Sequence, residues 1–68
     1  MPMSVHQMKA ALLFPSAVML VPFDGDEPLL VKHVDGDDPV ILIVRESNGD
    51  ERCVSWEHVC KNYEMVIV

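Results

Sequence analysis

The sequence predicts one small, mainly β domain of the α+β class: a five-stranded antiparallel barrel or curled sheet with a single N-terminal helix. Short apolar segments rich in β-branched residues recur along the chain, as they do in proteins built from short strands. Asp-Gly and Asn-Gly dipeptides separate several of these segments, and such dipeptides are typical of tight turns. The chain has 68 residues, of which 50% are hydrophobic, so residues 1–68 form one folded domain rather than a disordered segment.

The N-terminal segment predicts a helix over residues about 4–14. Ser4 and Gln7 have the spacing of a capping box, in which the serine side chain and the glutamine side chain each bind a free backbone N–H of the first turn. Pro15 ends the pattern, because the residue before a proline is disfavoured in helical geometry. Four apolar residues share one helical face: Val5, Met8, Ala11 and Leu12.

The next three segments predict strands over residues about 17–23, 29–34 and 40–46. Each is rich in Val, Ile and Leu and is bounded by Asp, Gly and Pro. The acidic turns 24–27 and 35–38 separate them. Pro28 and Pro39 follow these turns and suit the first position of a strand, because proline cannot donate a hydrogen bond to a neighbouring strand.

Asn48-Gly49 predicts a hairpin that leads into a fourth strand over residues about 51–56. A two-residue loop would place Glu46 opposite Glu51, and like charges in facing positions are unfavourable. A three-residue loop over 48–50 instead faces Glu46 with Arg52, and we expect this register.

Residues 57–62 predict one helical or 3₁₀ turn, and residues about 63–68 a closing strand that pairs inside the sheet. Five short strands with a helical turn before the last form a layout that resembles SH3-like small barrels. A curled antiparallel sheet with the helix on one face is the alternative architecture. The resemblance concerns architecture alone and implies no function.

Two of the predicted strands are apolar on both faces. Residues 40–44 and 17–21 carry hydrophobic side chains at every position, whereas a half-exposed strand would alternate. The second face needs cover from the helix, from barrel closure or from another subunit. A homodimer is therefore one of the outcomes that the sequence leaves open.

The charge of the chain narrows its class of partner. The formal net charge is −6, from eleven carboxylates against five Lys and Arg residues. Direct nucleic-acid binding needs a basic surface, which this sequence does not predict, so we do not expect the protein to bind DNA or RNA directly. The chain has no stretch that reads as a secretory signal or a membrane span, so we expect a cytoplasmic protein with free cysteines.

The acidic turns are the first candidate site. They carry six carboxylates, which are the ligands that calcium prefers, but neither turn has the EF-hand spacing, and turns select Asp and Gly in any case. We interpret them as solvated turns that offer a contact surface to a basic protein partner. Trp56 is a further candidate contact residue, although we favour the alternative in which it closes the end of the core. The candidate partner-binding residues are Asp24, Asp26, Glu27, Asp35, Asp37, Asp38 and Trp56.

Cys53, His58 and Cys60 are the alternative site, for zinc. Their spacing is irregular, since zinc sites usually show two matched ligand pairs, so no metal or other cofactor is expected. A Cys–His nucleophile pair has no support either, because His58 and Cys60 diverge on a helical turn. The protein is therefore not expected to be an enzyme.

The sequence favours a non-enzymatic protein-interaction module. In its specific form this is a regulator or inhibitor of the type that phages and mobile elements encode, which occludes a basic partner or mimics nucleic acid toward it. A zinc- or ligand-binding domain and a structural subunit of a homo-oligomer are the alternatives.

Overall fold

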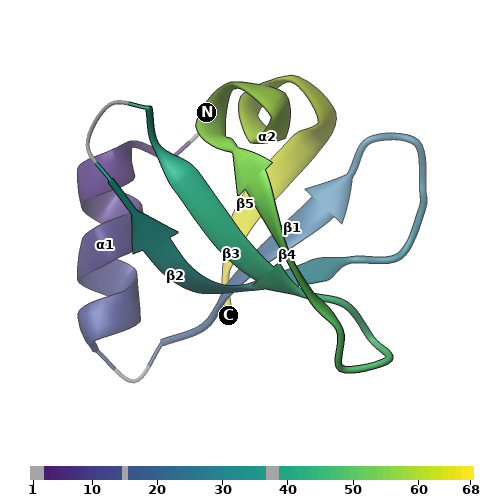
Figure 1. Cartoon of the computed structure of the whole chain (residues 1–68), viewed down its shortest axis with the longest axis horizontal. Coiled ribbons are helices and arrows are strands. Elements are labelled where there is room, and N and C mark those ends of the chain that lie inside the picture. The colour runs from purple at the N-terminus through teal and green to yellow at the C-terminus, as the bar shows by residue number, and fades with distance from the viewer. Residues whose placement is uncertain (1–2, 15, 37–38) are drawn as a thin grey trace.

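The chain folds into one curled sheet that carries two helices (Figure 1). The computed structural model describes residues 3–14, 16–36 and 39–68. The elements in chain order are α1 (Val5–Leu13), β1 (Val18–Pro22), β2 (Leu29–Asp35), β3 (Ile41–Arg45), β4 (Glu51–Ser55), α2 (Trp56–Asn62) and β5 (Tyr63–Ile67). The mainly β class with five antiparallel strands is confirmed.

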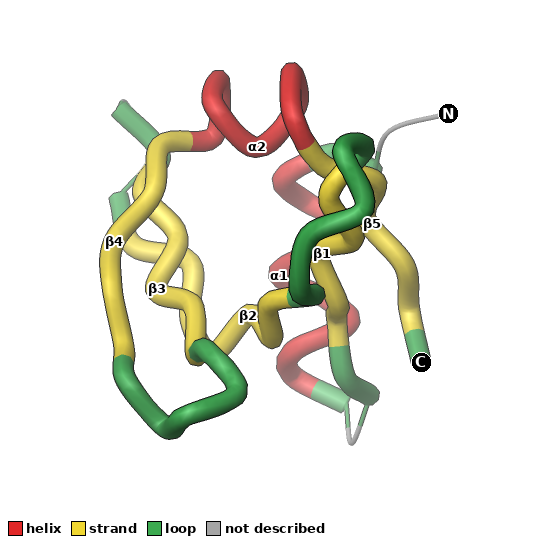
Figure 2. The backbone as a smooth tube through the Cα atoms, turned by 90° about the vertical axis from the view of Figure 1, so that its right-hand side faces the viewer, coloured by secondary structure: helices red, strands yellow, loops and turns green. Residues whose placement is uncertain are grey.

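The strands lie in the order β4-β3-β2-β1-β5, so β4 and β5 are the two edges of one open sheet. Figure 2 shows how the sheet curls, with β3 and β4 on one side, β1 and β5 on the other and α2 across the top. No hydrogen-bonded ladder joins β4 to β5 among the described residues. The closing strand does join the sheet, by pairing with β1, but it forms an edge, so the prediction that it lies inside the sheet was wrong.

Helix α1 begins at the predicted capping box. Ser4 Oγ accepts a hydrogen bond from the Gln7 backbone N–H at 3.1 Å, and Gln7 Oε1 accepts one from the Ser4 N–H at 2.8 Å. At the other end, Phe14 leaves the helix in an extended conformation, as expected before a proline. Met8 is fully buried among strand residues, so α1 is anchored against β1 and β2 through its apolar face.

Three glycines lie in the left-handed region, Gly25, Gly36 and Gly49, and the turn with Gly49 corrects the predicted hairpin. Gly49 has φ +90° and ends a loop over 47–49, closed by the Glu46 N–H bond to the Asp50 carbonyl at 2.8 Å. This loop has three residues, but it lies one position before the predicted loop, so Arg45 faces Glu51 and Val44 faces Arg52. A three-residue hairpin requires the left-handed residue at its third position, and Gly49 meets that demand without strain.

The segment after β4 is a full helix rather than a single turn, so the chain has two helices instead of the one expected. Ser55 caps α2 by accepting the His58 N–H at 3.1 Å, and Lys61 pairs with Glu57 one turn earlier at 3.1 Å. Val59 is fully buried, so α2 contributes to the core at the end of the curled sheet.

The core is formed by alternating residues from the inner side of the sheet, with Met8 of α1 and Val59 of α2. Leu42 and Val44 of β3 point inward and are fully buried, whereas Ile41 and Ile43 lie on the other face and are half-buried. The second apolar face of this strand is thus only partly covered by the described residues. Within residues 3–14, 16–36 and 39–68, neither helix is long and apolar enough to cross a membrane.

Candidate functional site

The first acidic turn and Asp35 lie at opposite ends of β2 (Figure 1). The turn with Asp24, Asp26 and Glu27 precedes β2, whereas Asp35 ends β2. Seven residues of extended strand separate them by roughly 20 Å. Asp37 and Asp38 lie outside the described residues. The expectation that both turns contribute to one acidic surface is therefore not met by Asp35.

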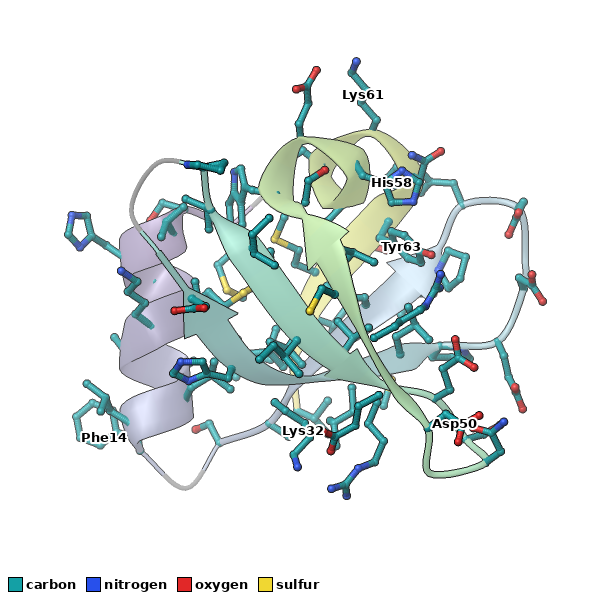
Figure 3. The ribbon with its side chains drawn as sticks, viewed as in Figure 1. Phe14, Lys32, Asp50, His58, Lys61 and Tyr63 are labelled. Carbon is teal, nitrogen blue, oxygen red and sulfur yellow. The ribbon has the colours of Figure 1, made fainter. Side chains whose placement is uncertain are left out.

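The β3–β4 loop lies beside the first acidic turn, whereas Asp35 does not. With the two residues that close it, this loop spans 46–50. Ser47 Oγ donates a hydrogen bond to Glu27 Oε2 at 2.7 Å, which joins the β1–β2 loop to the β3–β4 loop. Glu46 and Asp50 thereby come to the same end of the sheet, and Asp50 is visible there in Figure 3. In an antiparallel meander alternate turns lie at the same end, so carboxylates from the first and third turns gather there.

A groove of about 410 Å³ opens between this acidic end and helix α2. One wall is the β1–β2 loop with Phe23, and the opposite wall is α2 with the first residue of β5, Tyr63. Glu46 and Arg52 of the β3–β4 hairpin also line it. We call this the acidic groove, lined by Pro22, Phe23, Asp24, Asp26, Glu27, Leu29, Glu46, Arg52, His58, Lys61, Asn62 and Tyr63.

Local hydrogen bonds hold the carboxylates of the β1–β2 loop in place. Asp24 Oδ1 accepts the Asp26 N–H at 3.0 Å, and Asp26 Oδ1 accepts the Glu27 N–H at 3.0 Å. Gly25 adopts φ +84° between them and donates its N–H to the Pro22 carbonyl at 3.3 Å. The side chains of this loop are therefore oriented by their own backbone, as is typical of Asx turns.

The wall of the groove formed by α2 and the start of β5 carries two ring side chains, His58 and Tyr63, together with Lys61 and Asn62. The rings of His58 and Tyr63 meet edge to face with centroids 5.9 Å apart, and Figure 3 shows both beside the start of the β1–β2 loop. Asn62 Nδ2 donates to the His58 carbonyl at 2.9 Å and lies 3.3 Å from His58 Nδ1. The Asn62 carbonyl accepts the Phe23 N–H at 3.0 Å, so the two walls of the groove are joined at its base.

Some carboxylates of the acidic groove form ion pairs and others do not. Arg52 Nε binds Glu46 Oε1 at 2.9 Å, and Lys61 is paired with Glu57 outside the groove. Among the described residues no ion pair involves Asp24, Asp26 or Glu27. Phe23 stands beside these three carboxylates with 67% of its surface exposed. The arrangement can therefore attract a cation and offer it a ring face.

A second charge cluster lies on the outer surface of the same hairpin. Lys32 Nζ donates to Glu51 Oε2 at 2.6 Å, and Arg45 lies 3.5 Å from the same oxygen. The hydrogen bond from Lys32, its positive charge and the smaller effect of Arg45 together lower the pKa of the Glu51 carboxyl from its ordinary value. Because its two cations already neutralise Glu51, this cluster is an internal contact rather than part of the acidic groove.

Trp56 does not line the acidic groove. It is the first residue of α2, and its half-buried side chain packs against the core. Its backbone N–H donates to the Val40 carbonyl at 3.0 Å. Its position matches the interpretation in which the indole closes the end of the core.

The alternative zinc ligands do not come together. Cys53 lies in the edge strand β4, whereas His58 and Cys60 lie on α2, and all three are exposed. Nowhere in residues 3–14, 16–36 and 39–68 do three His, Cys, Asp or Glu residues form a group able to hold a metal ion. Cys53 is exposed, and not packed as a small hydrophobic residue, because it alternates with the inward-facing Val54.

The chain matches no known family model, and neither the curated proteins nor the solved structures contain a significant match to it. The site is therefore argued from its own geometry. Sequence reasoning missed Phe23, Tyr63 and Glu46 as groove residues. The alternation of turns in an antiparallel meander could have indicated Glu46, since it opens the β3–β4 turn, which lies at the same end of the sheet as the first acidic turn.

Proposed function

We propose that the protein is a non-enzymatic interaction module whose acidic groove binds a basic segment of a partner protein. The observation that carries the proposal is the juxtaposition, in one groove, of the exposed ring of Phe23 and three carboxylates that form no ion pair with any described residue. Arginine is the side chain that suits this combination, since its planar cation pairs with carboxylates and stacks on aromatic faces.

The geometry favours occlusion as the mode of action. A basic segment seated between Phe23 and Tyr63 is no longer accessible to another acidic ligand, and in many proteins such segments contact nucleic acid. A regulator or inhibitor of the phage or mobile-element type would act in this way. The finer architecture that we propose is an SH3-like barrel in which α2, rather than a β4–β5 ladder, covers the opening.

The test is an NMR titration of the ¹⁵N-labelled chain with a nona-arginine peptide and, separately, with nona-lysine. We expect shifts at the β1–β2 loop and at residues 58–63, and tighter binding of arginine because lysine stacks less well on a ring. Added salt should weaken both complexes.

Two variants of equal net charge separate the groove from general acidity. Asp24→Asn with Asp26→Asn keeps the oxygen acceptors of the loop and should weaken nona-arginine binding by about tenfold. Asp35→Asn with Glu64→Gln removes the same charge elsewhere and should leave binding nearly unchanged. Equal effects of the two pairs, or shifts spread over all acidic residues, would show that the groove is not the site.

A further inference from the structure

Exposed apolar side chains gather at the β5 edge of the sheet and at the adjoining end of α1. Leu13 and Phe14 are 86% and 69% exposed, and Ile67 and Val68 are 53% and 69% exposed. A second groove, of about 850 Å³, lies between this edge and α1. Ala10, Ala11 and Phe14 line its helical side, and residues 64–67 line its strand side.

Among the residues that the structure describes, β5 pairs only with β1, so its outer side is an open edge of the sheet. The Val68 N–H binds the Ala17 carbonyl at 2.8 Å, and the Asn62 carbonyl accepts the Phe23 N–H. Since the groups of an antiparallel strand alternate in direction, the even-numbered residues 62–68 face β1. The N–H and C=O groups of Met65 and Ile67 therefore point away from the sheet, toward an unoccupied strand position.

We infer that the β5 edge binds the β5 edge of a second copy of this chain, in an antiparallel pair centred on Val66. In this register Met65 pairs with Ile67 of the partner subunit, and Ile67 with the partner's Met65, which satisfies all four outward groups on each chain. Val66 faces the partner's Val66 in a non-hydrogen-bonded pair, where side chains approach most closely.

Charge and hydrogen bonding favour this register over its neighbour. Glu64 is the only charged residue of β5, and in the pair centred on Val66 the two Glu64 side chains lie about 13 Å apart, at opposite ends. A pair centred on Met65 would also use the Tyr63 N–H, which is already bound to the Val59 carbonyl. The Val66-centred pair therefore leaves no donor in competition and no like charges in contact.

The size of the surface indicates a dimer that dissociates readily. The exposed apolar patch is of the order of a few hundred Å², below the roughly 800 Å² per partner of a standard stable interface. The added strand also enters the groove along α1, where the small side chains of Ala10 and Ala11 leave room for it and the exposed ring of Phe14 can contact it. The two chains together carry twice the charge of −6, so salt should strengthen the dimer by screening their repulsion.

The experiment is sedimentation equilibrium of the full chain over a concentration series, with three variants. Val66→Glu and Val66→Arg each place like charges opposite one another and should raise the dimer dissociation constant at least about tenfold. An equimolar mixture of the two should dimerise again, because the central position then pairs Glu with Arg. Cys53→Glu, in the middle of the β4 edge, should leave the dimer unchanged, and NMR spectra of each variant verify its fold.

A wild-type chain that stays monomeric throughout the series would overturn the inference. So would a dimer that survives Val66→Glu, because a different surface would then hold it. Failure of the mixed sample to re-form a dimer while both variants are folded would reject the Val66-centred register. Binding of nona-arginine does not enter this experiment, so the outcome is independent of the acidic groove.

Discussion

The two edge strands of the sheet are finished in opposite ways. β4 presents Glu51 and Arg52, which are held in ion pairs with Lys32, Arg45 and Glu46. β5 carries one charged residue and ends in exposed Val66 and Ile67, which exposed Val68 follows. Charged edges discourage strand addition, because a neighbouring chain would have to desolvate them, whereas an apolar edge invites it. The β4 edge is therefore protected against strand addition by its charges, whereas the β5 edge has no such protection.

The largest expected effect comes from a matched pair of core substitutions, one under each edge. Leu20 faces Met65 across β1 and β5, and Leu42 faces Val54 across β3 and β4; both leucines are fully buried. Leu20→Ala and Leu42→Ala should each lower the free energy of unfolding by about 2–5 kcal/mol. Urea denaturation measures both, with trimethylamine N-oxide added where a variant is unfolded in water. A much smaller loss for Leu20→Ala would show that the β5 side is loosely attached.

A smaller effect is expected from the turn that builds the charged edge. Gly49→Ala places a β-carbon at φ +90°, where the strain should cost about 1–2 kcal/mol, although the space around it is open. Because β4 depends on this hairpin, the loss should appear in thermal unfolding and as faster amide exchange in β4 than in β5. An unchanged melting temperature would mean that the loop adopts another conformation.

The smallest effect is expected from the ion pairs of β4, and it depends on pH. The pKa of Glu51 is lowered below its ordinary value of 4.5, chiefly by its hydrogen bond from Lys32, so its stabilising contribution is present above that value. The contribution disappears as the pH falls through the lowered pKa. The melting temperature of the wild type should therefore exceed that of Glu51→Gln at pH 7, and the two melting temperatures should become equal in acid. A difference that persists below the folded pKa would assign the effect to packing instead of charge.

Much of the fold was predictable from local signals. The capping box at Ser4 and the alternation of apolar strands with Gly and Pro turns determine where the elements lie, and these are short-range effects. The register of the β3–β4 hairpin was not predictable from its charges, because the left-handed geometry of Gly49 determines where the loop ends. The expected contact of Arg52 with Glu46 nevertheless forms, as a diagonal pair at 2.9 Å.

The site was less predictable, since it depends on which turns share an end of the sheet. Charge alone drew attention to Asp24, Asp26 and Glu27, which do line a groove, and equally to Asp35, which does not. Phe23 and Tyr63 are distant in sequence and meet only because β5 pairs beside β1. Similarly, the exposure of Cys53 follows from its place on an edge strand, which composition does not reveal.

The pairing of β1 with β5 also has a kinetic consequence. Val18 lies opposite Ile67, 49 positions along the chain (67 − 18), whereas the other three strand pairs join consecutive strands. Contacts between distant residues form late, because the loop that they close costs more entropy than a hairpin does. We expect folding to be rate-limited by the arrival of β5. Until β5 pairs with it, β1 is itself an unpaired edge of the sheet. The chain is therefore most prone to aggregation before β5 has docked.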